Sequence, residues 1–123
     1  MAVNRKDYTE QGIIVLTPTD ELLTANVIHE IQAIIDSTAA KHVLIDFEGI
    51  QSLVSGSLYP HAEPIKPLLA LRQRLQHEAR RLVLCNLGSE FAEVFRLTHL
   101  DQMFEVQPDL DSALSNATGE IVE

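Results

Sequence analysis

The segment that most constrains the fold is a short apolar run that ends in an acid and is followed at once by a glycine turn. Val43-Leu-Ile-Asp46 has the length and the branched side chains of a buried strand, and Phe47-Glu-Gly49 turns the chain directly after it. Small hydroxyl residues follow in Gln51–Leu58, before a helical pattern begins. This order predicts a buried strand that delivers a serine to an exposed helix entrance. Such a serine could act as an enzyme nucleophile, as a cap or turn residue, or as a site where added charge controls binding.

Strand-like and helix-like segments alternate along the rest of the chain. A hairpin turn is predicted at Gln11-Gly12, and the strands are predicted at Lys6–Glu10, Ile13–Thr17, Val43–Asp46, Arg81–Cys85 and Phe104–Val106. The helices are predicted to begin after the cap Thr24, at Pro64 or Pro67 with an end near Ala79, at Glu90 after the cap Ser89, and at Pro108 with an end at Leu114. We therefore expect an α/β fold with a single mixed, mostly parallel sheet of about five strands and about four helices.

Length and composition indicate one ordinary globular domain. The chain has 123 residues, of which 46% are hydrophobic and 22% charged. We assign residues 1–115 to the domain and residues 116–123 to a polar, frayed tail. No apolar run is long enough to span a bilayer, and the first residues lack the apolar core of a signal peptide. We therefore expect a cytoplasmic protein.

The charge balance restricts the class of partner. Nine basic and 18 acidic residues give a net charge of −9. Phosphate contacts need a basic face, so we expect no nucleic-acid partner and no membrane partner. A basic protein partner fits better, although acidity also serves solubility. Asp20 and Glu21 precede the first helix, where they either complement its dipole or contact such a partner.

The chemistry-bearing residues do not form a recognisable catalytic or metal-binding motif. There is no phosphate-binding glycine loop, and Val54-Ser-Gly-Ser57 lacks the pattern of a nucleophile elbow. No metal spacing occurs among the histidines, which are His29, His42, His61, His77 and His99. Cys85 lies in an apolar strand, where a buried, inert thiol is expected. We therefore predict no enzyme activity, no metal and no cofactor, with a small hydrolase using Ser55 and a distant histidine as a rival hypothesis.

Four segments, in this order and spacing, resemble one known family. They are His42–Ile50, Leu53–Leu58, Arg81–Leu87 and Phe91–Phe104, the last resembling a helix and loop with the pattern Val-x-x-x-Phe-x-x-Thr-x-Leu-x-x-x-Phe. From Gly12 to about Leu114 the chain is similar to a STAS domain, the fold of bacterial anti-sigma factor antagonists.

The resemblance implies a regulatory role in transcription by partner switching. Family antagonists bind an anti-sigma factor that is also a serine kinase. The kinase phosphorylates a serine at the start of the second helix and so releases the pair, and a serine phosphatase restores binding. By position this serine is Ser55, with Ser57 as the second choice, and the implied partner-binding residues are Asp20, Glu21, Ser55, Gly56, Ser57 and Tyr59.

Two alternatives to this phospho-switch remain open. Ser55 could be only a cap or turn residue, since Gly56 and the prolines that follow differ from the family pattern. The chain could also be a scaffold subunit that resembles STAS proteins of larger signalling complexes and binds constitutively. The sequence leaves self-association open, a homodimer included.

Overall fold

A computed structural model of the chain describes residues 3–19, 24–50 and 62–118, and the side chains of all of these except residues 25, 62–65, 90 and 118. Five strands form one sheet in the order β1-β2-β3-β4-β5. The strands are β1 (Val3–Tyr8), β2 (Ile13–Pro18), β3 (His42–Asp46), β4 (Arg81–Cys85) and β5 (Glu105–Gln107). The helices of the described ranges are α1 (Ala25–Asp36), α2 (Ala62–His77), α3 (Ser89–Leu97), the short 3-10 helix η1 (Leu100–Gln102) and α4 (Leu110–Thr118).

The sheet is mixed and mostly parallel, which confirms the predicted fold class. β1 pairs with β2 in antiparallel fashion, from Val3 opposite Pro18 to Tyr8 opposite Ile13. All other neighbours in the sheet are parallel. Each parallel connection contains a helix, as crossover connections require.

The hairpin turn is longer than the predicted one. The β1–β2 ladder closes at Tyr8 and Ile13, so Thr9 and Glu10 belong to the turn and not to the strand. The Gly12 amide donates to the Thr9 carbonyl at 3.2 Å, and Gly12 has a φ of 68°. This left-handed conformation costs a glycine little, which explains its position at the end of the turn.

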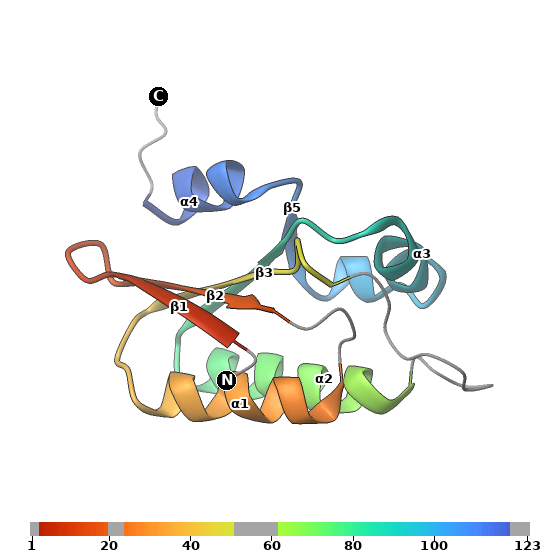
Figure 1. Cartoon of the computed structure of the whole chain (residues 1–123), viewed down its shortest axis with the longest axis horizontal. Helices are drawn as coiled ribbons and strands as arrows, with labels where there is room; N and C mark the ends of the chain where they lie inside the picture. Colours follow the sequence, from red (N-terminus) through yellow and green to blue (C-terminus); the bar gives the residue numbers. More distant parts are fainter. Residues whose placement is uncertain (1–2, 20–23, 51–61, 119–123) are drawn as a thin grey trace.

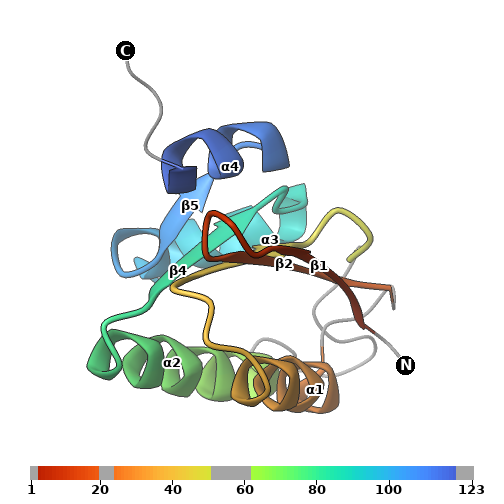
Figure 2. The ribbon, with the colours of Figure 1, turned by 90° about the vertical axis from the view of Figure 1, so that its left-hand side faces the viewer.

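Helices cover both faces of the sheet, so the sheet is the middle one of three layers. α1 and α2 lie side by side below the sheet and α4 lies above it, while α3 sits near the end of the sheet where β3 ends (Figures 1 and 2). Successive residues of a strand point to opposite faces. Ile14 and Leu16 of β2 therefore join the cluster beneath the sheet, and Ile13 and Val15 join the one under α4.

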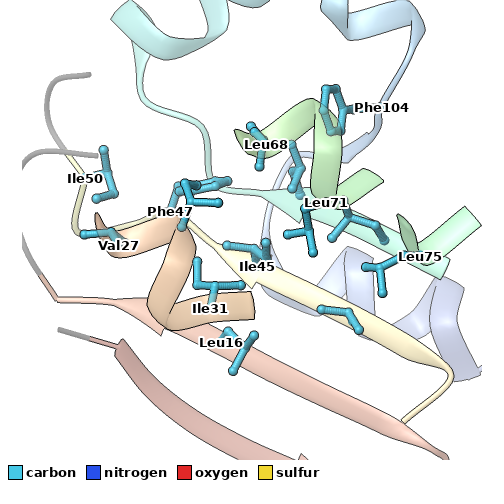
Figure 3. Packing of buried hydrophobic residues seen from close by; sticks show 14 of the residues in the cluster. Leu16, Val27, Ile31, Ile45, Phe47, Ile50, Leu68, Leu71, Leu75 and Phe104 are labelled. Carbon is cyan, nitrogen blue, oxygen red and sulfur yellow. The ribbon is translucent and has the colours of Figure 1, made fainter. Parts of the chain in front are cut away.

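The larger core lies between the sheet and the pair α1 and α2. Apolar residues recur at helical spacing on the inner faces of both helices, including Ile31 of α1 and Leu71 and Leu75 of α2 (Figure 3). These three side chains are fully buried. Thr24 caps α1 as predicted, since its Oγ1 accepts a hydrogen bond from the Val27 amide at 3.4 Å.

Three predicted helix boundaries differ from the structure. The cap of α3 is Gly88, which has no side chain to accept a hydrogen bond, and Ser89 is the first helical residue. α4 begins at Leu110, after Pro108, because the Asp109 carboxylate accepts from the Ser112 amide at 2.8 Å and sets the start of the helix. The same helix continues to Thr118, so residues 116–118, which were assigned to the frayed tail, are helical.

Smaller differences concern the other elements. α2 begins at Ala62, which places Pro64 in its first turn and Pro67 inside the helix. It ends at His77, two residues before the predicted end. β5 runs from Glu105 to Gln107 and starts one residue later than predicted, because Phe104 faces the core and not the sheet ladder.

Candidate functional site

The carboxyl ends of β2, β3 and β4 meet at one edge of the sheet, which is where parallel α/β sheets usually bind their partners or ligands. Asp46 is the last residue of β3 and is 4% exposed. It is the one buried charged residue in the part of the chain that the structure describes. A buried carboxylate is costly unless hydrogen bonds satisfy it, so its partners define the local structure.

Two hydrogen bonds satisfy the Asp46 carboxylate. Its Oδ1 accepts from the Glu48 amide at 3.0 Å and from the Asn86 side-chain Nδ2 at 2.9 Å. The first bond closes a turn directly after β3, and the second ties that turn to the residue after β4. Asn86 has a φ of 58°, a left-handed conformation that asparagine tolerates better than most residues.

The turn after β3 is also fixed against its neighbours on both sides. The Phe47 amide donates to the Cys85 carbonyl of β4 at 3.0 Å, and the Ile50 amide donates to the Phe47 carbonyl at 2.9 Å. A Cβ atom added at Gly49 would lie 3.3 Å from the Pro18 carbonyl oxygen at the end of β2. Any larger residue at Gly49 would therefore press on β2.

Aromatic packing holds α3 at this edge. The Phe47 and Phe91 ring centroids are 4.9 Å apart, and those of Phe91 and Phe95 are 5.1 Å apart. Phe95 continues the row to Phe104, with a centroid distance of 5.4 Å. Tilted and edge-to-face rings at these distances attract one another beyond simple burial. Phe47, directly after β3, is thus connected by the two aromatic rings of α3 to Phe104, directly before β5.

All the predicted site residues lie outside the described residues. Asp20 and Glu21 fall in 20–23, and Ser55, Gly56, Ser57 and Tyr59 fall in 51–61. The described flanks of these two segments are nevertheless close, because Gly49 contacts the end of β2 at Pro18. The described residues that precede segments 20–23 and 51–61 are therefore adjacent, and the residue that follows the second segment, Ala62, is the first of α2.

Cys85, in contrast, is within the described residues and is chemically quiet. Its thiol is fully buried beside the end of β3. Burial is the main cause that raises its pKa to about 12, and the nearby Asp46 carboxylate adds to the shift. The thiolate is thus absent at neutral pH, which agrees with the predicted inert thiol.

Sequence reasoning missed Asn86 and the hydrogen bonds that satisfy Asp46. Asp46 ends the strand predicted at 43–46 and Asn86 follows the one predicted at 81–85, and the carboxyl ends of parallel strands share an edge. That juxtaposition was the available signal. Nowhere among the described side chains do three His, Cys, Asp or Glu residues gather closely enough to hold a metal ion. Within the same ranges, no helix is long and apolar enough to cross a bilayer.

Solved structures of other proteins share this architecture. No curated protein sequence matches the chain. An anti-sigma factor antagonist from Mycobacterium paratuberculosis has 22% identity and a TM-score of 0.72, with 94% of this chain and 92% of that chain covered. The anti-sigma factor antagonist SpoIIAA in its unphosphorylated form has 19% identity and a TM-score of 0.72, with 99% and 100% covered. The Bacillus cell fate determinant SpoIIAA in its phosphorylated form has 18% identity and a TM-score of 0.65, with 94% and 98% covered. At these identities the structures establish a shared fold.

The family model described as the STAS domain matches residues 4–113, and the chain therefore belongs to the STAS domain family.

Proposed function

We propose that this chain is an anti-sigma factor antagonist that acts by binding and carries out no catalysis. It binds an anti-sigma factor with serine kinase activity, and phosphorylation at Ser55, or at Ser57 if the register differs, dissociates the complex. A serine phosphatase restores binding. The partner surface comprises Asp20, Glu21, Gly56 and Tyr59 together with these serines.

The observation that carries the proposal is the anchored turn after β3. Asp46 and Asn86 fix the chain where it leaves the sheet, and Gly49 lies against the end of β2. The described residues before segments 20–23 and 51–61 thus lie at one edge of the sheet, which supports a single partner for both segments. Fixing the points from which a binding surface starts lowers the conformational entropy that is lost on association.

The physical effect of the phosphate follows from its charge. A phosphoserine carries about −1.5 to −2 charge at neutral pH. The chain already has a net charge of −9. A phosphate inside a packed interface adds a large desolvation cost, so the complex dissociates while the fold persists. SpoIIAA itself has been solved in both unphosphorylated and phosphorylated forms, and both resemble this chain.

The test is phosphorylation and binding with the anti-sigma kinases encoded in the source genome. The full chain is incubated with each purified kinase and ATP, and phosphate is mapped by mass spectrometry. We expect phosphate on Ser55 or Ser57, and loss of that phosphate in the corresponding alanine variant. Phosphorylation confined to residues outside 52–57 would contradict the phospho-switch.

Binding is measured on phosphomimetic variants by isothermal titration calorimetry. Ser55→Asp is expected to weaken binding to the kinase, in part only, because aspartate carries less charge than phosphate. Thr9→Asp is the matched control, since Thr9 is exposed in the hairpin turn at the opposite edge of the sheet. Equal weakening by both variants would indicate general charge repulsion and would contradict a local switch.

A further inference from the structure

β1 is the outermost strand at one edge of the sheet, and among the described residues it pairs only with β2 (Figure 1). It has six residues, whereas β5 at the other edge has three. Four consecutive residues of β1 are exposed, from Asn4 to Asp7. Every second residue of an edge strand points its backbone N–H and C=O groups outward, where another strand can pair with them. The long unpaired edge of this sheet is therefore that of β1.

The side chains of β1 alternate between the two faces of the sheet. Val3 belongs to the buried cluster on the side of α1 and α2, and Tyr8 packs against the cluster under α4. By this alternation Arg5 and Asp7 project on the side of α1, and Lys6 projects on the side of α4. The contacts agree, because Arg5 Nη2 lies 3.1 Å from Asp7 Oδ2 and Lys6 Nζ lies 5.4 Å from the centroid of the Tyr8 ring. One face of the edge thus carries a positive and a negative charge two residues apart.

The helix beneath this edge leaves open space beside it. Asp36 of α1 pairs with Arg74 of α2, while the next residue, Ser37, accepts a hydrogen bond from Arg5 at 3.4 Å. The α1 face that carries Ser37 therefore lies on the side of β1. The residues of that face line an open hollow of about 420 Å³ and are Glu30, Ala33, Ile34 and Ser37. The hollow leaves room for the side chains of a second strand beside β1.

We propose that two copies of the chain pair through their β1 strands in antiparallel fashion and form one continuous sheet. In a two-fold dimer centred at Lys6, Arg5 of each copy lies opposite Asp7 of the other copy. Directly opposite residues of an antiparallel pair lie on the same face, so two intermolecular ion pairs form. A pairing centred at Arg5 or at Asp7 would instead set like charges opposite each other without an ion pair in return. The segment from Arg5 to Asp7 is therefore complementary in charge to itself, which identifies a second copy as the occupant of the edge.

Lys6 makes this pairing weak and reversible. The register sets Lys6 opposite Lys6 of the second copy, and like charges directly opposite each other destabilise a strand pair. Both ammonium groups stay at the surface on the α4 side, each near the Tyr8 ring of its own copy. An edge of six residues also buries less than the roughly 800 Å² per partner of a standard interface. We therefore expect a dimer that forms at about 10 µM to 1 mM protein.

Sedimentation velocity of the full chain over this concentration range tests for the dimer. Asp7→Arg sets positive charges opposite each other at both outer pairs, and Arg5→Asp sets negative charges there. Each single variant is expected to raise the Kd of the dimer by about tenfold or more. The double variant that carries both exchanges restores the opposite charges and should dimerise like the unmodified chain. Lys6→Thr removes the like-charge pair and should dimerise more tightly.

An equimolar mixture of the two single variants tests the register directly. The Arg5→Asp chain and the Asp7→Arg chain each repel copies of themselves but complement each other, so mixed dimers should form. Isotope labelling of one variant identifies the mixed dimer by its mass in native mass spectrometry. Arg96→Asp and Glu93→Arg are the matched controls, since they change the net charge by the same amounts on the exposed face of α3 and should leave the Kd unchanged. Circular dichroism reports whether each variant is folded.

The proposal is overturned if the chain stays monomeric at about 1 mM, the upper end of the range for so small an interface. It is also overturned if the single reversals leave the Kd unchanged, or if the mixture yields no mixed dimers. Equal weakening by the α3 controls would show that net charge governs association and would exclude the β1 edge. Each of these results leaves the antagonist role untouched, because the carboxyl ends of β2, β3 and β4 take no part in the pairing.

Discussion

The Asp46 carboxylate accepts a hydrogen bond from the Asn86 side chain at 2.9 Å, across the carboxyl ends of β3 and β4. The two residues are 40 positions apart in sequence and meet because Asp46 of β3 is paired with Cys85 of β4 in parallel register. The same carboxylate caps the turn at Glu48. One buried group therefore fixes the point from which the proposed partner-binding segment starts.

Removal of the Asp46 carboxylate should be strongly destabilising. Asp46→Ala leaves the Glu48 amide and the Asn86 side chain without their acceptor in a buried place. We expect the free energy of unfolding to fall by about 2–4 kcal/mol, as for other losses of a charged acceptor. Urea denaturation followed by circular dichroism measures this change. A loss below about 0.5 kcal/mol, the range of ordinary surface changes, would contradict the anchoring role.

A double-mutant cycle isolates the bond between the two side chains. Asn86→Gly is the suitable partner variant, because glycine adopts the φ of 58° at no steric cost while removing the donor. The two substitutions share an interaction, so their combined effect should be smaller than the sum of the single effects by about 0.5 kcal/mol or more. Additive effects would show that the bond contributes nothing to stability.

Arg80 should contribute more to stability than its neighbour Arg74. The Arg80 side chain is 11% exposed. It donates to the carbonyls of Ala40 and Thr38, in the segment that connects α1 to β3. Arg80→Met would leave both acceptors partly buried and unpaired. We expect a loss of about 1.5–3 kcal/mol in the free energy of unfolding. Urea titration gives the value.

The control for Arg80 is Arg74→Met, which removes the same group from the surface. The Arg74 side chain is 35% exposed and bonds to carboxylates, those of Asp36 and Glu78, that water can also solvate. Exposed ion pairs contribute about 0–1 kcal/mol, so the loss should be correspondingly small. Equal losses at the two positions would contradict the role assigned to the Ala40 and Thr38 carbonyls.

Local sequence signals predicted the elements well where a single physical cause dominates. The continuous apolar run before Asp46 is typical of a strand that is buried on both faces of a sheet. Thr24 precedes a helical pattern of apolar residues and has the side chain of an N-cap. The predicted helix boundaries were wrong where two sequence signals compete. At the last helix Pro108 favours a first-turn position, but the Asp109 carboxylate is the better cap and starts the helix two residues later.

The candidate site could be predicted only in part, because its geometry depends on pairings distant in sequence. Asp46 was recognised as the acid that ends a buried strand, but its bond to Asn86 follows from the β3–β4 register. The closeness of Gly49 to Pro18 likewise depends on β2 and β3 being neighbours. Ser55 and the other partner-binding residues lie outside the described residues, so their role stays a prediction.

Cys85 should resist thiol reagents while the protein is folded. Its pKa is raised to about 12, mainly by burial, so the reactive thiolate is scarce at any pH where the protein is handled. We expect no labelling by a disulfide-exchange reagent at about pH 8 within the time in which a free thiol reacts fully, and one equivalent of labelling in denaturant. Cys85 is the chain's one cysteine, so no second thiol complicates the count. Fast labelling of the folded chain would contradict its burial.

His42 should make the fold sensitive to mild acid. Its Nδ1 is buried and has no hydrogen-bond partner. No other buried side-chain nitrogen or oxygen atom of the described residues lacks a partner. Burial lowers the pKa of His42 below 6.5, and the positive charge of Arg81 lowers it further, while Glu105 acts in the opposite direction.

The direction of the pH effect follows from the lowered pKa of His42. The folded state favours neutral imidazole, so the stabilising contribution is complete above the unfolded pKa of 6.5 and is lost as the pH falls through 6.5 toward the lower folded pKa. His42→Gln keeps a polar side chain of similar length that does not titrate. The stability advantage of the unmodified chain over this variant should therefore shrink between about pH 7.5 and pH 5.5. Urea titrations of both proteins across this range measure the difference, and an NMR titration of His42 should give a midpoint below 6.5. An advantage that stays constant, or that grows toward acid, would show that His42 becomes protonated in the folded chain without penalty.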